Sequence, residues 1–529
     1  MRYSVSRHTV TFVLFCALVL STATAATINV PIDQPTIQEG IDSAFNGDTV
    51  LVAAGVYTGI GNRDMDFGGK QITVKSESGP DFTIIDCQGD TLSPHRAFLF
   101  HTGEDSTTKL EGFTIRGGLV VDGSGAAILC DTASPKISNC RFVRNKCHFE
   151  LVGNEFTLAA GGAVVCNNSF AIFENCVFDS NFAHAGGALV CDYSSQLTML
   201  GCSFTANQTG PRHVAGFTFS GGGGAIACIG SSSLTLSDCS FSWNAGGAGG
   251  ALFLHNSTAS FQSCVFESNL ANGVALVNLL APGQRGAIYC EITTLTLTEC
   301  VFTRNVATSP EFQSGPGIGG AAYFTQCSPS LTSCTFFANS ASEYMTFTGL
   351  GGAICLSNAY PTIEKCIISF SESGNSISRL SSLSVPTLLC CDIYGNDDGD
   401  WVEFIADQLD SNDNFSQDPL FCDTSSNDLS IQGNSPCAQS RSLCGQQVGA
   451  IEPACGCCAI AGDSDGEGEV NIGDAIHIVK YVFTNGQTPV CLDEGDADGS
   501  NDINIGDATY IVKFVFQDGV APVCGTRGS

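Results

Sequence analysis

One phrase repeats through the middle of this 529-residue chain and constrains its fold more than any other feature. Each copy reads Gly-Gly-Ala, a short apolar run, and then a cysteine followed by x-Phe-x-x-Asn. Gly161–Asn181, with the sequence GGAVVCNNSFAIFENCVFDSN, is one clean copy, and Gly223–Asn244 is another. Such self-similarity indicates a solenoid, in which each unit buries its apolar face against its neighbours. The cysteine that precedes the Phe, here called the second slot, recurs at Cys140, Cys176, Cys202, Cys239, Cys264, Cys300, Cys334 and Cys366.

The spacing between copies varies at one place in the repeat. Successive second-slot cysteines are 36, 26, 37, 25, 36, 34 and 32 residues apart, and the variation falls between the closing Asn and the next glycine pair. We therefore expect short bare coils, with the longer coils carrying an insertion at one shared corner. Such insertions either pack over the coil edge or form a binding face. Their aromatic and charged residues include Phe149, Phe156, Arg212, His213, Phe217, Phe219, Arg285 and Phe312.

Each position of the phrase has an expected place in a coil. The paired glycines permit a positive-φ corner between two strands. The Phe follows the cysteine by two residues, so both point to one face of a strand, and we expect that face to be the interior. The closing Asn tolerates the left-handed conformation and can bond to the Asn of the next coil as a ladder. The expected stack of rings contains Phe142, Phe178, Phe204, Phe241, Phe266, Phe302 and Phe336.

The cysteines leave two alternatives open. A first slot, four residues after the second glycine, holds cysteine in five coils and Leu254, Phe324 or Leu356 in three. Because cysteine alternates there with large apolar residues, we expect this slot to face inward. Stacked cysteines on neighbouring coils are about 4.8 Å apart, which allows either buried free thiols or vertical disulfides. The first-slot cysteines are Cys130, Cys166, Cys191, Cys228 and Cys290; Cys422, Cys437, Cys444 and Cys455 lie in loops and are better disulfide candidates.

The N-terminus carries an export signal and a cap. Arg2 and Arg7 precede the apolar run Val10–Leu20, and Ala23-Thr24-Ala25 is a small-x-small cleavage site, so residues 1–25 are predicted to be a secretory signal peptide. Residues 28–57 follow as a strand, a short helix and a second strand, an arrangement suited to covering the open first coil of a solenoid.

These segments carry a family resemblance. The cap at residues 28–57 and the coils of Asn62–Gly89 resemble the start of pectin-lyase-like right-handed parallel β-helices from secreted bacterial proteins. The Gly-Gly-Ala-Ile and Phe-x-x-Asn pair resembles the repeats of polymorphic outer-membrane proteins. The resemblance implies an all-β fold, a right-handed parallel β-helix across residues 26–455, in which Asp418–Cys437 gives one or two terminal coils.

After this body the composition shifts, because Ala459–Ser529 holds 12 acidic residues against three basic ones. Two matching segments, Gly462–Phe483 and Gly495–Phe516, each open with oxygen ligands at EF-hand spacing and continue into an apolar helix. Hard oxygen ligands at these spacings wrap a calcium ion, so two Ca²⁺ sites are expected. The expected ligands are Asp463, Asp465, Glu467, Glu469, Asn471 and Asp474 in the first loop and Asp496, Asp498, Ser500, Asp502, Asn504 and Asp507 in the second, with Glu469 and Asp502 contributing backbone carbonyls.

The duplicated loop and helix at residues 459–525 resembles a type I dockerin domain. The resemblance implies a small α-helical module that docks on a cohesin through loop positions 10 and 11. Those positions hold Ile472, Gly473, Ile505 and Gly506 instead of a hydroxyl pair, so the expected partner is a cohesin-like domain or a neighbouring surface protein. Cys491 and Cys524, each preceded by Pro-Val, are expected to tie the module together.

Charge and hydropathy exclude two classes of partner. The net charge is −31, and a nucleic-acid partner is not expected because phosphate binding requires clustered Lys and Arg. After the leader, no stretch is long and apolar enough to span a bilayer. We expect a protein that is secreted, extracellular or held at the cell surface.

The sequence offers little catalytic chemistry. The seven histidines after the leader are scattered, and no His-Glu-x-x-His, Gly-x-Ser-x-Gly or phosphate loop is present. The one dense carboxylate group in the β-helix contains Asp392, Asp397, Asp398 and Asp400, which form either a solvated loop or a catalytic or calcium site. The leading hypothesis is therefore a carbohydrate-binding or adhesive scaffold that is anchored by its calcium module. The alternative is a polysaccharide lyase or O-glycosyl hydrolase carried by that module, with Asp397, Asp398 and Asp400 as the candidate catalytic residues.

Overall fold

The computed structural model describes residues 25–148, 160–210, 212–214, 217–219, 222–272, 285–308, 316–343, 348–456, 458, 460–484, 486–489 and 491–525. The predicted signal peptide lies outside these residues up to position 24, as do Phe149, Phe156 and Phe312 of the insertions. Within the described residues, no helix is long and apolar enough to cross a membrane.

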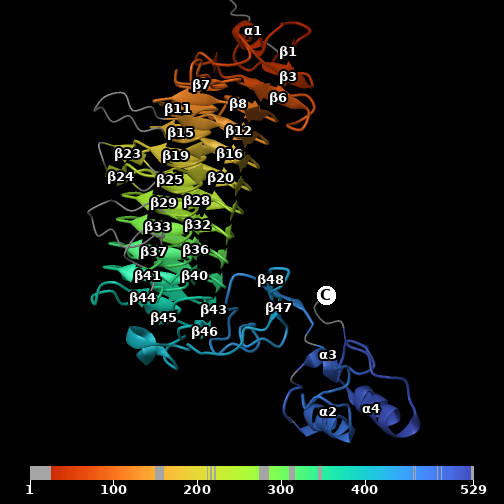
Figure 1. Cartoon of the computed structure of the whole chain (residues 1–529). Helices are drawn as coiled ribbons and strands as arrows, with labels where there is room; N and C mark the ends of the chain where they lie inside the picture. Colours follow the sequence, from red (N-terminus) through yellow and green to blue (C-terminus); the bar gives the residue numbers. More distant parts are fainter. Residues whose placement is uncertain are drawn as a thin grey trace, which may run out of the picture.

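The body of the molecule is a stack of coils built from parallel sheets (Figure 1). A coil contributes at most one strand to each sheet, and neighbouring strands in these sheets, which belong to successive coils, pair in parallel. The sheet with the most strands contains β1 (Thr27–Val30), β2 (Thr49–Val52), β5 (Thr73–Ser76), β8 (Lys109–Glu111), β12 (Lys136–Ser138), β16 (Ile172–Glu174), β20 (Gln196–Leu200), β26 (Ser233–Ser237), β30 (Thr258–Gln262), β34 (Thr294–Thr298), β38 (Ser330–Thr332), β42 (Thr362–Glu364) and β45 (Thr387–Leu389).

A second sheet carries the Phe of the repeated phrase at its inward positions. Its strands are β3 (Gly55–Tyr57), β6 (Thr83–Asp86), β9 (Thr114–Arg116), β13 (Arg141–Val143), β17 (Val177–Asp179), β21 (Ser203–Thr205), β27 (Ser240–Ser242), β31 (Val265–Glu267), β35 (Val301–Thr303), β39 (Thr335–Phe337), β43 (Ile367–Ser369) and β46 (Asp392–Tyr394).

A third sheet follows the glycine pair and carries the first slot. Its strands are β4 (Met65–Asp66), β7 (Phe98–Phe100), β11 (Ile128–Asp131), β15 (Val164–Asn167), β19 (Leu189–Asp192), β25 (Ile226–Cys228), β29 (Leu252–His255), β33 (Ile288–Glu291), β37 (Ala322–Thr325), β41 (Ile354–Ser357) and β44 (Ile377–Arg379).

A fourth, shorter sheet follows the closing Asn of each coil. It contains β10 (Leu119–Val121), β14 (Lys146–His148), β18 (Phe182–Ala183), β22 (Gln208–Thr209), β28 (Ala245–Gly246), β32 (Leu270–Ala271), β36 (Val306–Ala307) and β40 (Ser340–Ala341). The insertion after β22 contains an antiparallel pair, β23 (Arg212–Val214) and β24 (Phe217–Phe219).

The expected N-terminal cap is present. Helix α1 (Ile37–Ser43) buries Ile37, Gly40 and Ile41 against the first coil and lies at the β1 end of the stack (Figure 1). The Thr36 side chain begins the helix by accepting a hydrogen bond from the Glu39 amide at 3.2 Å. The open edge of the solenoid is thereby covered, which removes a template for edge-to-edge pairing.

The expected ring stack runs up the interior. Phe178 and Phe204 are fully buried, and their centroids lie 4.5 Å apart with an interplanar angle of 2°. The next steps of the stack, from Phe204 through Phe241 and Phe266, are each 4.8 Å. These spacings match the distance between neighbouring strands, so the pairing register alone brings the rings into face-to-face contact.

The asparagine ladder is also present, with one difference in backbone conformation. In each coil the Asn Oδ1 accepts from the backbone amide and the side-chain amide of the preceding Asn, as Asn207 does from Asn181 at 3.0 and 2.9 Å. The Asn207 Nδ2 donates to Phe178 O at 2.8 Å, and its side chain is fully buried. The Asn does not use the left-handed conformation that this residue type tolerates; the residue before it does, with φ of 54° at Ala206. The turn is made one residue earlier because the Asn side chain must point inward to reach the next coil.

The glycine corner follows the prediction. Gly161 has φ of 59°, and a Cβ placed there would lie 2.2 Å from Val164 O, so both the conformation and the space require glycine.

The core cysteines are buried free thiols, the first of the two alternatives. Both slots face inward, as shown by the complete burial of Cys166 and Cys176. Desolvation by burial raises the pKa of the Cys140 thiol and, in the last coil, raises that of the Cys391 thiol to about 12. They therefore act as small apolar residues in the stack.

The C-terminal end of the body departs from the prediction. Asp418–Cys437 does not form further coils, because β47 (Phe421–Asp423) and β48 (Asp428–Gln432) pair antiparallel and only β49 (Pro453–Cys455) joins them in parallel. Arg304 Nη1 and Thr303 Oγ1 both donate to Asn427 Oδ1 at 3.0 Å, and the Phe337 and Phe421 rings meet edge to face at 5.4 Å. These contacts dock the hairpin on the outside of the stack instead of extending it.

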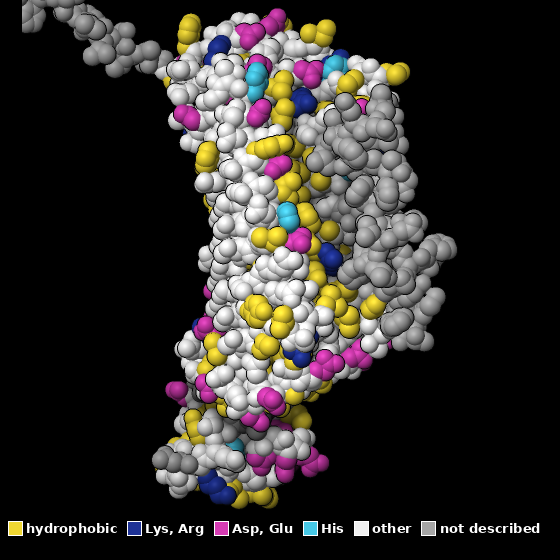
Figure 2. All heavy atoms as spheres, turned by 90° about the vertical axis from the view of Figure 1, so that its left-hand side faces the viewer, with side chains coloured by type: hydrophobic (Ala, Val, Ile, Leu, Met, Phe, Trp, Pro, Cys, Tyr) yellow, Lys and Arg dark blue, Asp and Glu magenta, His cyan; other side chains and the backbone are white. Residues whose placement is uncertain are grey.

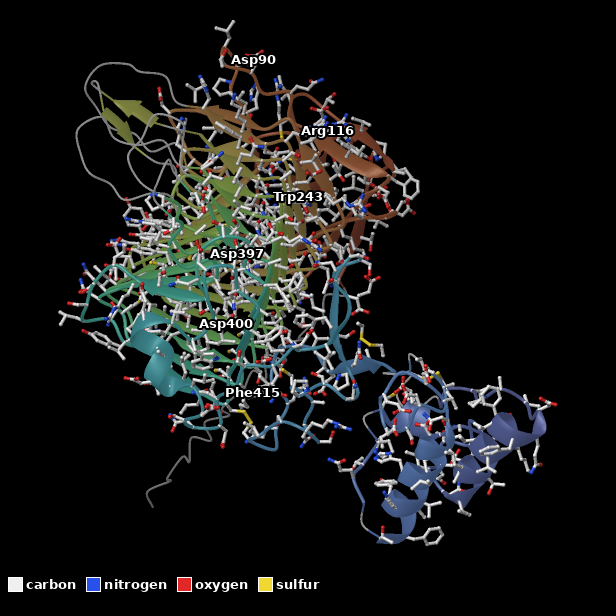
Figure 3. All side chains as sticks on the ribbon, turned by 60° about the horizontal axis from the view of Figure 1, so that its bottom comes forward. Asp90, Arg116, Trp243, Asp397, Asp400 and Phe415 are labelled. Carbon is white, nitrogen blue, oxygen red and sulfur yellow. A yellow bond between two sulfur atoms is a disulfide. The ribbon has the colours of Figure 1, made fainter. Side chains whose placement is uncertain are left out.

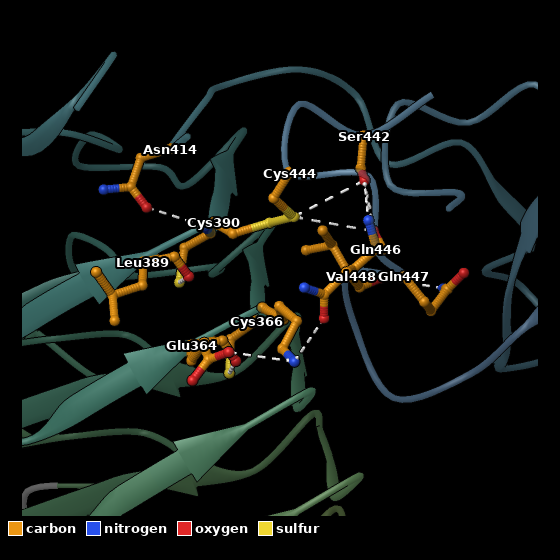
Figure 4. The surroundings of a disulfide bond; sticks show 12 residues. Glu364, Cys366, Leu389, Cys390, Asn414, Ser442, Cys444, Gln446, Gln447 and Val448 are labelled. Atoms are coloured by element: carbon orange, nitrogen blue, oxygen red, sulfur yellow. Dashed lines mark hydrogen bonds and ion pairs between the residues drawn. A yellow bond between two sulfur atoms is a disulfide. The ribbon is translucent and has the colours of Figure 1, made fainter. Parts of the chain in front are cut away.

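Disulfides fasten this end region. Cys390 bonds to Cys444 (Figure 4), and Cys422 bonds to Cys455. Beside the first of these, Lys365 Nζ donates to Gln446 Oε1 at 3.0 Å. The prediction is confirmed for three loop cysteines and wrong for Cys437, which is a buried free thiol. The last coil is followed by a 3-10 helix, η1 (Glu403–Gln408).

The tail forms a small helical module beyond the hairpin, beside the end of the stack (Figure 1). Its helices are α2 (Ile472–Thr484), α3 (Leu492–Gly495) and α4 (Ile505–Gln517). The buried apolar residues of this module are Ala475, Ile478, Ala497, Ala508 and Ile511.

Candidate metal centre

Two acidic triads lie at the starts of α2 and α4. In the first, ligand oxygens of Asp463, Asp465 and Asp474 all lie within 4.8 Å of one another. In the second, Asp496, Asp498 and Asp507 make the same arrangement 33 residues later. The two loops that match in sequence therefore also place their equivalent aspartates in the same arrangement.

Backbone amides of each loop position the carboxylates. Asp474 accepts from Ser464 N at 2.7 Å and from Asn471 N at 2.8 Å, and Asp463 accepts from Gly466 N at 2.9 Å and from Gly468 N at 2.7 Å. The loop therefore folds around its first and last acidic residues, which brings them together across ten intervening positions.

The second loop repeats this pattern. Asp507 accepts from Asp498 N at 3.1 Å and from Asn504 N at 2.8 Å. Asp496 accepts from Ser500 N at 2.9 Å and from Asn501 N at 2.6 Å.

The donor set fits a hard cation. Asp474, Asp496 and Asp507 are fully buried, and Asp463 is 3% exposed. Desolvation raises the pKa of both Asp474 and Asp507, although the loop amides oppose this. Three carboxylates held this close repel one another, and a Ca²⁺ ion coordinated by their oxygens would offset both the repulsion and the lost hydration.

The other predicted ligands lie around the triads. Asn471 Oδ1 accepts from Gly473 N at 2.6 Å, and Asn504 Oδ1 accepts from Gly506 N at 2.7 Å, so both begin a helix. Glu467 bonds to Asn471 on the outside of the first loop, and Ser500 Oγ donates to Asp502 O at 3.3 Å. The carboxylates of Glu467, Glu469 and Asp502 are not among the oxygens that the structure brings together. The backbone-carbonyl role expected for Glu469 and Asp502 stays a prediction.

A disulfide closes the module differently from the expectation. Cys524 bonds to Cys458, so the expected bond between Cys524 and Cys491 is wrong. Cys491 is itself disulfide-bonded and buried. The Cys458–Cys524 bond ties the end of the module to its beginning, which encloses both acidic loops in one covalent ring.

An apolar groove runs between α2 and α4. Its volume is about 340 Å³, and it is lined by matching residues of the two helices. Ile472 and Ile505, two of the predicted partner-contact residues, stand at it with 41% and 49% of their surface exposed. The sequence prediction missed the rest of the lining, although its periodic apolar spacing could have revealed it: Ala475, Ile476, Val479, Lys480, Ala508, Thr509 and Val512.

The acidic group at the end of the β-helix does not converge on one point. Asp400 accepts from the amides of Gly395 and Asn396 at 3.0 and 2.8 Å, and Asp398 accepts from Gly374 N at 3.0 Å. Figure 3 shows Asp397 and Asp400 on the end of the stack that faces the viewer. Asp398 and Asp400 therefore stabilise the loop, and the solvated-loop alternative describes them.

Asp392, the fourth member of that group, lies in β46 and is fully buried. Its Oδ2 accepts from the Cys437 thiol at 3.2 Å, and its Oδ1 accepts from Gln417 N at 3.0 Å. Burial raises its pKa to about 7. The Asp392 side chain is thus part of the packing between the last coil and the end region.

Outside the module, a row of apolar side chains follows the outer face of the third sheet (Figure 2). The Phe253 and Tyr289 centroids are 5.1 Å apart, and those of Tyr289 and Tyr323 are 5.7 Å apart. The Arg285 guanidinium lies 4.6 Å from the Tyr289 centroid and 4.7 Å from that of Tyr323. For this insertion residue, packing over the coil edge is the correct alternative.

Comparison with known proteins agrees with this architecture. The sequence matches the family described as right handed beta helix region over residues 70–217 and 212–349, which together exceed half of the chain. The chain therefore belongs to this family of parallel solenoids. No curated protein matches the sequence.

Several solved polysaccharide lyases are distantly similar. For the PL6 family alginate lyase AlyGC the identity is 13% and the TM-score 0.36, over 74% of this chain and 53% of that one. For pectate lyase Pel9A the values are 12% and 0.34, over 82% of this chain and 97% of that one. A mannuronic acid specific family 6 lyase from human gut microbiota gives 12% and 0.31, over 70% and 87%. The chain spans about half the length of AlyGC, and the reactions of these enzymes are not transferred to it.

Proposed function

We propose that this protein is an exported β-helical scaffold whose C-terminal module binds two Ca²⁺ ions and docks on a partner protein. The observation that carries the proposal is the pair of matched aspartate triads at the starts of α2 and α4. These two helices line one apolar groove together. Ion binding at both loops would fix the two helices relative to each other and so hold the groove in shape. The module would then be a dockerin-like device for anchoring the β-helix.

The leader sequence and the disulfides support export. Arg2, Arg7 and the apolar run that follows are the features of a signal peptide, and disulfides persist in oxidising compartments. A secreted scaffold tethered at one end can present a long lateral surface to a polysaccharide or to neighbouring surface proteins.

A calorimetric Ca²⁺ titration of the mature full-length protein tests the metal sites. We expect two ions per chain, one ion for D463N/D465N and for D496N/D498N, and none for the variant that combines all four changes. D397N is the matched control, because it removes a loop carboxylate outside both triads and should leave the stoichiometry at two. The absence of Ca²⁺ uptake by the unmodified protein would refute the proposal.

The docking step has its own test. A panel of cohesin-like domains is screened with and without Ca²⁺, and I472D/I505D places two charges in the groove without touching a triad carboxylate. Binding should require the ion and should be lost in this variant while both ions still bind. If binding survives these charges, the partner does not occupy the groove.

The alternative of a polysaccharide lyase or O-glycosyl hydrolase remains a prediction. The loop-stabilising role of Asp398 and Asp400 favours the scaffold instead. Release of unsaturated or reducing sugars from a polysaccharide panel, lost in D397A or D400A, would restore the enzymatic alternative.

A further inference from the structure

Three side chains at the N-terminal end of the stack form a hydrogen-bonded line. Ser93 Oγ lies 2.9 Å from His95 Nε2, and His95 Nδ1 lies 2.6 Å from Asp64 Oδ2. A hydroxyl, the two nitrogens of one imidazole and a carboxylate, in this order, form the arrangement that activates a serine nucleophile. Neither the coil repeat nor the calcium module accounts for these three residues.

The hydrogen-bond chemistry fixes the direction of proton transfer. A carboxylate can only accept, so a neutral His95 must carry its proton on Nδ1 and donate it to Asp64. The lone pair of Nε2 then faces Ser93 and accepts the hydroxyl proton. His95 is therefore poised as a general base, and Asp64 holds the imidazole in the required tautomer and orientation.

Backbone hydrogen bonds hold the Ser93 turn in place. Asp90 Oδ1 accepts from Leu92 N and Ser93 N at 2.8 and 2.7 Å, and Asp90 N donates to Ser93 O at 3.0 Å. Figure 3 shows Asp90 at the outer edge of the N-terminal end.

Backbone bonds also fix the base and the carboxylate. His95 exchanges two backbone hydrogen bonds with Leu119, at 2.8 and 2.9 Å, and Asp64 exchanges backbone and side-chain bonds with Arg96, at 2.8 and 3.0 Å. His95 and Asp64 are thus attached to the body of the solenoid, which favours a fixed geometry of this pair.

The site opens to solvent. Ser93 is exposed, while the side chains of His95 and Asp64 are 19% and 44% exposed. Histidine and acidic side chains gather at this end of the face drawn in Figure 2. An exposed serine can reach an ester group that is carried by a large or extended molecule.

We propose that Asp64, His95 and Ser93 form a hydrolytic site that cleaves accessible carboxylic esters by way of an acyl-serine. Ser93 Oγ attacks the ester carbonyl and its proton passes to His95 Nε2. The bond between the carbonyl carbon and the alkoxy oxygen then breaks, and His95 returns the proton to the leaving alcohol. A water molecule attacks the acyl group with His95 again as the base, which releases the acid and restores the Ser93 hydroxyl.

The chain contains its own control close by, at the far end of the paired strands β4 and β7. His101 Nε2 lies 3.1 Å from Asp66 Oδ2, so this pair also joins an imidazole to a carboxylate of the preceding coil. Among the residues that the structure describes, no serine bonds to the other ring nitrogen of His101. The H101Q variant should therefore behave as the unmodified protein, while H95Q should not.

A covalent probe supplies the first test. The full-length protein is incubated with a fluorophosphonate, which forms a bond from Ser93 Oγ to phosphorus and expels fluoride, and the adduct is located by peptide mass spectrometry. We expect labelling at Ser93 that falls at least about 100-fold in H95Q, the loss typical of removing a general base, and is unchanged in H101Q. No adduct at Ser93, or equal labelling of H95Q, would overturn the proposal.

Turnover of p-nitrophenyl acetate supplies the second test of the hydrolytic site. An initial burst of about one equivalent of p-nitrophenol per chain marks the acyl-serine, and S93A should abolish it. D64N should lower kcat/KM at least about 10-fold without changing the melting temperature, because Asp64 acts through the orientation of His95. A burst that persists in S93A would show that another residue is acylated and would refute the assignment.

Discussion

The β-helix and the C-terminal module bury opposite kinds of side chain. The interior of the solenoid is a continuous column of Phe, Leu, Ile and Cys with a ladder of neutral amides, all close to zero exposure. Among its described residues, the module buries only a small cluster of apolar side chains, and it buries carboxylates next to them. The first region is stable because each coil is the template of the next. The second has too small a core to stand alone and depends on disulfides and, we propose, on bound ions.

Calcium removal should separate the two regions by the largest margin. An ion at about 1,000 times its Kd stabilises the folded module by about 4 kcal/mol per site, so removing both ions should destabilise it by about 8 kcal/mol. We expect EDTA to abolish the far-UV circular dichroism of α2 and α4 at a temperature where the sheet signal is unchanged. In the variant with all four triad aspartates of the calorimetric test replaced, EDTA should have no effect. A single transition that is insensitive to EDTA would show that the module is stable without ions.

The solenoid should respond instead to a change in its ring stack. Phe204→Ala removes a fully buried ring that stacks on Phe178 and Phe241, and it should lower the free energy of unfolding of the β-helix by about 3–5 kcal/mol. Phe170→Ala is the control, because Phe170 is 52% exposed. Chemical denaturation followed by sheet circular dichroism measures both variants, and Ca²⁺ binding by the module should be the same in each. Equal effects of the two changes would contradict the stacked core.

The regions also differ in how well the sequence predicted them. The Phe stack, the Asn ladder and the glycine corner were predictable, because each is one local pattern repeated and the parallel register places equivalent residues together. The acidic loops were predictable because their spacing is local: Asp463 and Asp474 are eleven positions apart. The position of the left-handed residue just before each ladder Asn was not predictable, because it depends on where the Asn side chain must point.

Contacts between unlike segments escaped prediction. Asp392 and Cys437 meet across 45 positions, and Asp64 and His95 across 31, without a repeat to signal either pair. A motif search looks for catalytic residues at fixed spacing, whereas Asp64 reaches His95 from the neighbouring coil. The hairpin of β47 and β48 was missed for the same reason, since its docking on Arg304 and Phe337 is visible only in three dimensions.

The end of the solenoid buries the carboxylate of Asp392, as the module buries those of its triads, and its pH response tests that likeness. Burial raises the pKa of Asp392 to about 7 from its ordinary value of 3.8. The folded state therefore favours the protonated form: the full stability is present below pH 4 and is lost as the pH rises through 7. Asp392→Asn should keep the shape of this side chain without the pH-dependent loss. Relative to the unmodified protein, its free energy of unfolding should therefore rise by roughly 2–4 kcal/mol between pH 4 and pH 8.

The measurement for Asp392 is a series of urea unfolding curves across this pH range for both proteins. D397N serves as the control, because it removes a carboxylate from the adjoining loop, and it should run parallel to the unmodified protein. A pH-independent difference between D392N and the unmodified protein would show that Asp392 does not titrate in this range.

The smallest effect concerns the sulfur atoms, which play different roles in the two regions. Cys239 is a buried free thiol in the second slot, so Cys239→Ala removes one sulfur atom and should destabilise the β-helix by about 1 kcal/mol. A disulfide at that position would instead contribute about 2–5 kcal/mol and would respond to a reductant. Dithiothreitol should therefore leave the melting of the repeated coils unchanged in both proteins, while it lowers that of the module, whose ends are joined by Cys458 and Cys524. If the reductant lowers the melting of the coils and removes the difference between the two proteins, the cysteine column is bonded and not free.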